Sequence, residues 1–252
     1  MKVNYDKVSE IYDNRYKESK LLGVEKTLTE IINTNNVKSI LEVGCGTGYW
    51  LKKFTGLDFL AGVDFSRGML KREKKDPKIN YICADANNLP LLKEKFDLIY
   101  CINAIHHFNK PLQFINETYH LLKKGGRLCI FGANPSESAN EWYIFDYFRG
   151  TFENDKKRFP ETNKLKSKIL ESGFSNLEYK IVDIVDRCKT NYQIFDDLFL
   201  VKDATSELYL ISQNEYDEGI KRMKAQIEDN KNFGKDTKFR TLLHFYLICG
   251  VK

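Results

Sequence analysis

The sequence predicts an α/β fold in which one doubly wound, mostly parallel sheet is covered by helices on both faces. Apolar runs of strand length recur along residues 38–133, and segments of helical length separate them. Such alternation is typical of parallel strands joined by right-handed crossover helices. In addition, the first apolar run leads into a glycine-rich loop, and the second ends at Asp64. Glycines and a carboxylate at these two places indicate a ligand site at the carboxyl edge of the sheet.

The elements of the first half follow from this alternation. Continuous apolar character is typical of strands buried on both faces, and it predicts strands at 38–43, 59–64, 79–84, 96–102 and 127–133. Before and between them we expect helices at 20–34, 47–54, 66–74 and 111–123. The last helix is expected to end at Gly125-Gly126, because glycine tolerates the left-handed conformation that closes many helices.

The regular alternation loosens after residue 133. An aromatic-rich segment comes first, followed by a helix at 162–172 and a strand at 177–185. The chain closes on an apolar run at 241–249 with no helix after it, so we expect a seventh strand tucked antiparallel into the sheet. These boundaries predict one domain, residues 1–252, with N-terminal helices acting as a lid at 1–34 and with substrate-cap segments at 134–160 and 187–236. A helix is expected within the second cap segment, at 213–229.

Composition and charge narrow the class of protein. Forty basic residues against thirty-five acidic ones give a formal net charge of +5. The basic clusters at 71–75 and 156–158 are not interleaved with aromatic residues, so we expect no nucleic-acid partner. No run approaches the about 20 apolar residues of a membrane span, and no signal peptide is evident. The six cysteines have no metal-ligand spacing. We therefore expect a cytoplasmic protein with no membrane attachment and no metal.

The glycine loop itself indicates which ligand it holds. Gly44, Gly46 and Gly48 alternate along the loop, so a ligand can lie against bare backbone. Asp64, at the end of the next strand, can accept two hydrogen bonds from a ribose diol. A dinucleotide fingerprint would need its third glycine at the position of Tyr49, and no Lys-Ser/Thr pair follows the loop as in a phosphate-binding P-loop. A nucleoside-bearing cofactor without a pyrophosphate fits best.

The motif E-x-G-x-G-x-G, residues 42–48, resembles motif I of the class I S-adenosylmethionine-dependent methyltransferases. Three further segments resemble the family in order: 84–86, where an acid meets the adenine amino group; 96–100, the strand that ends near the transferred methyl; and 121–128, the turn before the fifth strand, with Lys124 in place of a proline. The resemblance implies a Rossmann-like doubly wound seven-stranded sheet, mostly parallel with an antiparallel C-terminal strand, plus a capping insertion. It also implies S-adenosylmethionine as cofactor and S-adenosylhomocysteine as product.

The same resemblance assigns cofactor contacts to particular residues. Asp64 is expected to hold the ribose and Asp85 the adenine amino group, with Ala86 leaving room for the ring. Glu42 is expected to orient the glycine loop or to meet the methionine ammonium through water. Tyr12 and Arg15, in the N-terminal helix, are candidates to close over the cofactor, since guanidinium binds carboxylate in bidentate fashion. The full cofactor set is Tyr12, Arg15, Glu42, Gly44, Gly46, Gly48, Asp64, Phe65, Asp85, Ala86 and Asn103.

His106 and His107 follow the fourth strand, where the family places its reaction centre. Histidine suits proton removal from a hydroxyl acceptor, so we expect one of them to act as general base and favour His107. Adjacent side chains on a helical turn diverge by about 100°, which predicts that only one of the two faces the substrate. The expected reaction is methyl transfer to a small molecule, with O-methylation favoured.

Other functions stay open at this point. Some methyltransferases need no base, and nitrogen or carbon acceptors, including quinone or polyketide rings, are compatible with the motifs. A non-catalytic S-adenosylmethionine-binding module would keep the same loop, and an RNA methyltransferase is a weaker variant. An NAD-dependent oxidoreductase would share the ribose acid but lacks its glycine spacing. Nothing in the sequence names the acceptor or the oligomeric state.

Overall fold

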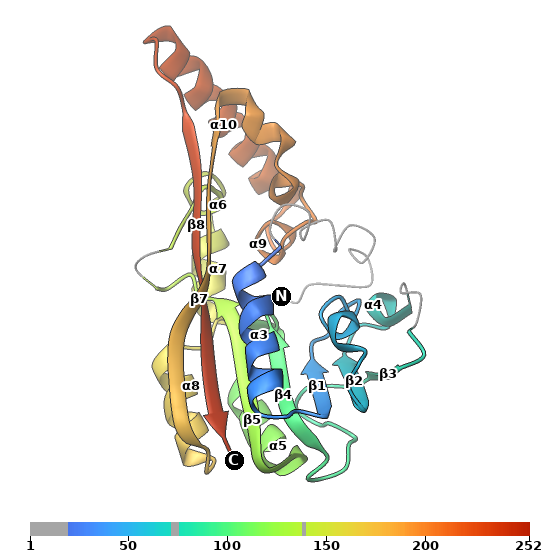
Figure 1. The fold of residues 1–252 in the computed structure, drawn as a ribbon. Helices are drawn as coiled ribbons and strands as arrows, with labels where there is room; N and C mark the ends of the chain where they lie inside the picture. Colours follow the sequence, from blue (N-terminus) through green and yellow to red (C-terminus); the bar gives the residue numbers. More distant parts are fainter. Residues whose placement is uncertain (1–19, 72–75, 138–139) are drawn as a thin grey trace.

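The computed structural model describes residues 20–71, 76–137 and 140–252. Within them one sheet runs in the order β3-β2-β1-β4-β5-β8-β6, and β7 pairs with β8 (Figure 1). Five strands are mutually parallel, and they are β1 (Ser39–Val43), β2 (Phe59–Asp64), β3 (Ile79–Cys83), β4 (Phe96–Ile102) and β5 (Leu122–Ala133). The C-terminal strand β8 (Lys238–Val251) lies antiparallel to β5 and to β7 (Ser175–Thr190). The predicted fold class is therefore confirmed. The described sheet has eight strands rather than seven, because the two-residue strand β6 (Glu141–Trp142) adds to β8.

The central strands β1, β2 and β4 are buried on both faces, which is why they consist mainly of apolar residues. On one face Leu41 and Ile99 pack into a cluster with Phe114 and Leu165, which belong to α5 (Pro111–Leu121) and α8 (Thr162–Glu171). On the other face Ile40 and its neighbours pack against α3 (Leu22–Thr34). α3 is also tied to β7, since Gly23 N donates to Asp183 Oδ2 at 2.7 Å. The described part of the predicted lid, α3, thus covers a sheet face.

Two predicted helices differ from the observed ones for local reasons, and a third is described only in part. The segment 47–54 contains only a short 3-10 helix, η2 (Leu51–Phe54), since Gly46 and Gly48 have positive φ and hold the preceding loop irregular. α4 (Arg67–Lys71) is described only to Lys71, because 72–75 lie outside the described residues. α5 ends at Leu121 rather than at the paired glycines. Gly125 instead lies in β5, where the register with β4 is irregular.

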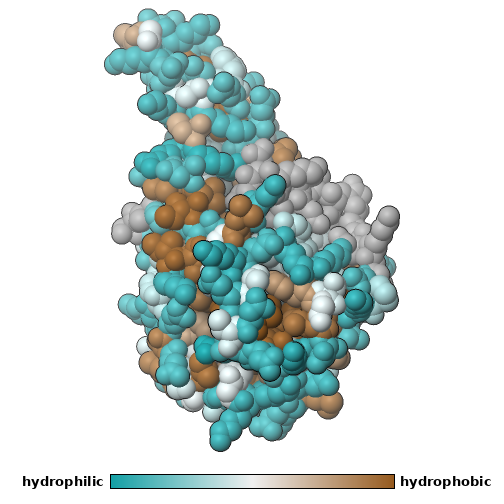
Figure 2. Space-filling view, viewed as in Figure 1, coloured by the Kyte–Doolittle hydropathy of each residue, from teal (hydrophilic) through white to brown (hydrophobic). Residues whose placement is uncertain are grey.

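The second half forms a cap with a hydrophobic core of its own. α6 (Tyr143–Tyr147) and α7 (Thr151–Arg158) follow β5, while η4 (Asn191–Asp196), η5 (Leu198–Leu200), α9 (Ser206–Tyr209) and α10 (Gln213–Asn232) connect β7 to β8. Apolar residues from α6, α10 and the 3-10 helices form one buried cluster, separate from the two that cover the sheet. The long β7–β8 pair carries α10 away from the rest of the sheet (Figure 1). The outer surface of this end is mainly hydrophilic (Figure 2). Across the described residues, no helix has the length and apolarity needed to cross a membrane.

Candidate active site and cofactor cavity

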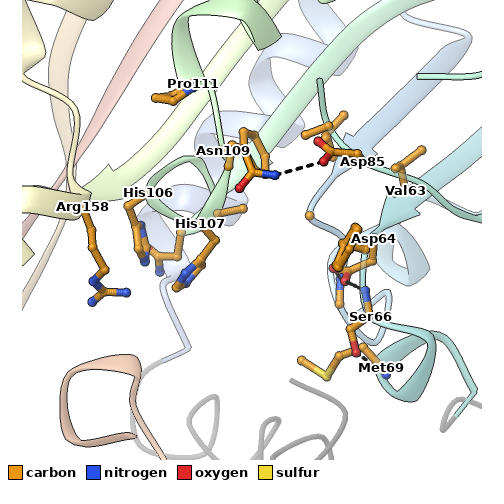
Figure 3. Close-up of a pocket in the computed structure, with 18 of the residues that line it drawn as sticks. Val63, Asp64, Ser66, Met69, Asp85, His106, His107, Asn109, Pro111 and Arg158 are labelled. Carbon is orange, nitrogen blue, oxygen red and sulfur yellow. Dashed lines mark hydrogen bonds between the residues drawn. The ribbon is translucent and has the colours of Figure 1, made fainter. Parts of the chain in front are cut away.

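A cavity of about 760 Å³ lies at the carboxyl edge of the parallel strands (Figure 3). Its walls come from the glycine loop after β1, from the ends of β2 and β3, from the turn after β4, and from residues 157–160 at the end of α7 and just after it. Parallel strands bring their carboxyl ends to one edge, so segments distant in sequence meet here. This edge is where the sequence predicts the ligand site.

The glycine loop has little room for side chains. Gly44, Gly46 and Gly48 have φ of +75°, +55° and +77°, a region that only glycine adopts readily. A Cβ at Gly44 would lie 2.4 Å from Ala104 Cβ, and one at Gly48 would lie 2.3 Å from Tyr81 Oη. Gly44 and Gly46 line the cavity, whereas Gly48 is packed beneath the loop against the ring of Tyr81.

Asp64 fixes the geometry of this loop and still faces the cavity. Its Oδ2 accepts from Gly46 N at 2.8 Å and its Oδ1 from Ser66 N at 2.8 Å. A carboxylate offers about four lone-pair positions, so each oxygen can accept a further bond from a ligand hydroxyl. Phe65, next in the chain, lines the same cavity with 72% of its surface exposed.

Asp85 is held at the end of the next strand by the turn that follows β4. Its Oδ1 accepts from Asn87 N at 2.8 Å, and its Oδ2 accepts from Asn109 Nδ2 at 3.1 Å (Figure 3). Asn87 bonds in turn to the backbone of Lys110 through both ends of its amide. These bonds join the segment that follows β3 to the turn that follows β4. Asp85 and Ala86 both line the cavity.

Glu42 lies underneath the loop and does not line the cavity. Its side chain is 1% exposed, and Tyr100 Oη donates to Glu42 Oε2 at 3.3 Å. Burial raises the pKa of Glu42 well above its usual range, and the nearby charge of Asp64 acts in the same direction. The described position suits an internal support of the loop, and any meeting with a methionine ammonium stays a prediction.

The histidine pair forms the opposite wall. His106 and His107 end the short 3-10 helix η3 (Ile105–His107), and their ring centroids are 3.9 Å apart. His106 also stacks on Phe159, with centroids 4.0 Å apart and planes 12° from parallel. Both histidines line the cavity, together with Asn103, whose φ is +50°. The expectation that the two side chains diverge was wrong, because their rings lie against each other in this short 3-10 turn.

Comparison with known proteins agrees with this geometry. A family model described as a methyltransferase domain matches residues 41–130. A phthiotriol/phenolphthiotriol dimycocerosates methyltransferase of Mycobacterium leprae is 29% identical over 160 residues, 60% of this chain and 55% of that protein, so the chain spans about half of it. A demethylmenaquinone methyltransferase of Renibacterium salmoninarum is 27% identical over 168 residues, 56% of this chain and 68% of that protein. A crystal structure of a candidate methyltransferase from an antibiotic biosynthesis pathway of Anabaena variabilis superposes with a TM-score of 0.68 at 20% identity, covering 88% of this chain and 96% of that one. The family match and these relatives support assignment of the chain to the class I S-adenosylmethionine-dependent methyltransferases.

Nine of the predicted site residues of this methyltransferase meet in one cavity. They are Gly44, Gly46, Asp64, Phe65, Asp85, Ala86, Asn103, His106 and His107. Glu42 and Gly48 support the loop from below. Tyr12 and Arg15 lie outside the described residues.

Sequence reasoning missed two parts of the methyltransferase cavity. Asn109, which anchors Asp85, lies only two residues beyond the histidine pair, and its short amide side chain after a 3-10 turn was an available signal. Arg158 and Phe159 reach the cavity from the end of α7. No motif marks them, since their place depends on how the cap packs against the sheet.

Proposed function

We propose that this methyltransferase moves the methyl group of S-adenosylmethionine to a small-molecule acceptor, with a hydroxyl as the favoured nucleophile. One observation carries the proposal: Gly44, Gly46, Asp64 and Asp85 share a single cavity with the histidine pair. Such a cavity can hold a nucleoside at one wall and a reacting group at the other. The names of the Mycobacterium leprae and Renibacterium salmoninarum relatives, which refer to phthiotriol and demethylmenaquinone, also support a small-molecule acceptor.

Each wall has a distinct role in this proposal. The Asp64 carboxylate binds the ribose hydroxyls, Asp85 accepts from the adenine amino group, and Phe65 packs against the purine. Ala86 leaves space for the ring, and Asn103 and the glycine loop adjoin the methionine part. Tyr12 and Arg15 close over the cofactor, with the guanidinium on its carboxylate. The part of segment 1–34 that precedes α3 supplies the lid, and segments 134–160 and 187–236 supply the substrate cap of this one domain.

The reaction is a displacement at the sulfonium methyl carbon. A lone pair of the acceptor oxygen forms the new C–O bond while the C–S bond breaks, and the sulfur keeps the electron pair. The hydroxyl proton passes to an imidazole, which exchanges protons near neutral pH. We assign this base to His107, because the His106 ring is stacked on Phe159 and forms a flat wall beside it. Alignment of oxygen, methyl and sulfur supplies the rest of the rate.

Calorimetric titration of the full chain with S-adenosylhomocysteine tests the cofactor half of the proposal. We expect micromolar binding by the parent and a loss of at least about tenfold, 1.4 kcal/mol, in Asp64→Ala. Asp58→Ala is the matched control, since Asp58 is exposed just before the amino end of the same strand. Absence of binding by the folded parent would reject the proposal. Equal losses in both variants would reject the role of Asp64.

Turnover separates the enzyme from a module that only binds the cofactor. A panel of hydroxyl, amine and carbon acceptors is offered with S-adenosylmethionine, and formation of S-adenosylhomocysteine is measured. Turnover with a hydroxyl acceptor supports O-methylation. Turnover only with amines would reject O-methylation, indicate N-methylation and remove the need for a base.

A further inference from the structure

A second, smaller cavity of about 140 Å³ lies between the cap and η3. It shares Asn103, His106, His107 and Phe159 with the cofactor cavity, so the two spaces meet at the histidine pair. A molecule in the smaller cavity would therefore lie next to the proposed base. On the proposed function, this is the place of the methyl acceptor.

Aromatic rings give this cavity flat apolar walls. Trp142 meets Phe145 edge to face, with centroids 5.4 Å apart, and meets Phe199 in the same way at 6.4 Å. All three line the cavity. Interlocked rings hold one another in position and leave slots that suit a planar apolar body.

Buried donors that lack acceptors lie at and beside this cavity: Trp142 lines it, and Arg158 contacts Ser206 and Glu207, which line it. Arg158 Nη2 donates to Ser206 Oγ at 3.2 Å and to Glu207 Oε1 at 3.3 Å, and it also pairs with Asp155. Among the described residues, Arg158 Nε and Nη1 have no hydrogen-bond partner although they are buried, and the same holds for Trp142 Nε1. Buried donors without partners are uncommon in folded proteins and cost free energy. A ligand oxygen that accepts from them removes this cost.

The charges around the cavity also favour an anion. Both carboxylates, Asp155 and Glu207, already contact Arg158. Burial, reinforced by the charge of Glu207, raises the pKa of Asp155 to about 8, so this carboxyl keeps its proton at neutral pH. A second guanidinium, that of Arg187, lies 4.8 Å from the Phe199 ring on the same wall. A guanidinium at this wall, in addition to that of Arg158, disfavours a cationic amine.

We propose that the acceptor is a planar aromatic molecule with an anionic oxygen, bound by the guanidinium of Arg158 and the indole N–H of Trp142. This deepens the proposed function and rests on it. Arg158 lines the cofactor cavity on the same side as His106 (Figure 3), and its partners Ser206 and Glu207 line the smaller cavity next to it. The anion is thereby anchored beside the histidines, and another group of the same molecule is left to reach the methyl carbon. Arg158 and Trp142 act here as specificity-determining residues.

The test measures ligand binding to the full chain saturated with S-adenosylhomocysteine. Matched trios of carboxylate, carboxamide and aminomethyl compounds are titrated, built on one-ring and two-ring hydroxylated aromatic bodies such as 4-hydroxybenzoate, its amide and 4-hydroxybenzylamine. We expect at least one carboxylate to bind ten times more tightly than its amide and its amine. Equal binding within every trio, tighter binding of the amines, or no binding by any carboxylate would overturn the proposal.

Variants assign the effect to the named groups. Arg158→Gln is compared with Lys156→Gln, which removes the same charge from an exposed position on the same helix. Trp142→Phe keeps the ring and removes only the donor, so it serves if Arg158→Gln does not fold. We expect tenfold weaker carboxylate binding in Arg158→Gln and Trp142→Phe and unchanged binding in Lys156→Gln.

Failure of this inference is distinguishable from failure of the proposed function. If Trp142→Phe and the parent bind S-adenosylhomocysteine equally but no trio shows a preference, only the acceptor class is wrong. If the folded parent does not bind S-adenosylhomocysteine, the cofactor proposal itself is wrong.

Discussion

Gly44 faces Ala104 so closely that adding one methyl group there should disturb both walls of the cofactor cavity. A Cβ at Gly44 would lie 2.4 Å from Ala104 Cβ, which is 1.0 Å short of the 3.4 Å at which ordinary contact begins. The φ of +75° adds strain for any residue with a Cβ, about 1–2 kcal/mol. Overpacking of a tight site costs about 1–3 kcal/mol more. We therefore expect Gly44→Ala to lower the free energy of unfolding by roughly 2–5 kcal/mol.

A second glycine separates strain from crowding. Gly125 has a similar φ of +77°, but a Cβ there would meet nothing within 4 Å. Gly125→Ala should therefore cost only the strain, about 1–2 kcal/mol, and should leave cofactor affinity unchanged. The assays are thermal unfolding, where 1 kcal/mol corresponds to roughly 2–4 °C for a domain of this size, and calorimetric titration with S-adenosylhomocysteine.

The two assays give a clear contrast. Gly44→Ala should unfold on the order of 10 °C lower and bind S-adenosylhomocysteine at least about tenfold more weakly, because Gly44 and Ala104 both line the cavity. If Gly44→Ala and Gly125→Ala behave alike in both assays, the close approach to Ala104 does not shape the site, and the reasoning from the glycine loop is refuted.

Three further predictions concern titratable groups. The folded pKa of Asp155, about 8, exceeds its ordinary 3.8, so the free energy of unfolding should fall as pH rises from about 4 to 8. Asp155→Asn cannot titrate, so its melting temperature relative to that of the parent should rise across this range. A difference in melting temperature that does not change with pH would contradict the shift. His107→Gln should lower turnover with a hydroxyl acceptor by about 10²- to 10⁴-fold with little change in S-adenosylhomocysteine affinity, and full activity would exclude His107 as the base. Tyr100→Phe removes the hydroxyl that donates to buried Glu42 and should cost about 1–3 kcal/mol in urea unfolding; an unchanged midpoint would show that the Glu42 carboxyl does not need it.

The cofactor half could be predicted from sequence because its signals are local. Strands buried on both faces are apolar throughout, and the loop that follows β1 needs glycine at the positions where φ is positive. Asp64 comes directly at the end of β2, so its place at the sheet edge follows from the order of the chain. The burial of β8 in the sheet could also be expected, because the run 241–249 is mainly apolar.

The acceptor half could not be predicted, because long-range packing decides it. The lengths of β7 and β8 are set by their mutual pairing over 175–190 and 238–251. The pairing of β5 with β8 likewise brings Cys129 and Cys249 to opposite positions, with their sulfur atoms 3.1 Å apart, although 120 residues separate them in sequence. Burial of Glu42 beneath the loop depends in the same way on Tyr100, which comes from a different strand.

The three hydrophobic clusters show how the packing of the cap is linked to the histidine pair. The cap has its own buried cluster, which shares no buried residue with the two clusters on the sheet. The buried core of the cap can therefore change without repacking the two cores that cover the sheet. Phe159 links the cap to the histidine pair, because it follows α7 and its ring stacks on His106. A displacement of α7 would move the ring on which His106 rests, so the way the cap packs can govern the geometry of the reaction centre even though none of its core residues reaches the cofactor cavity.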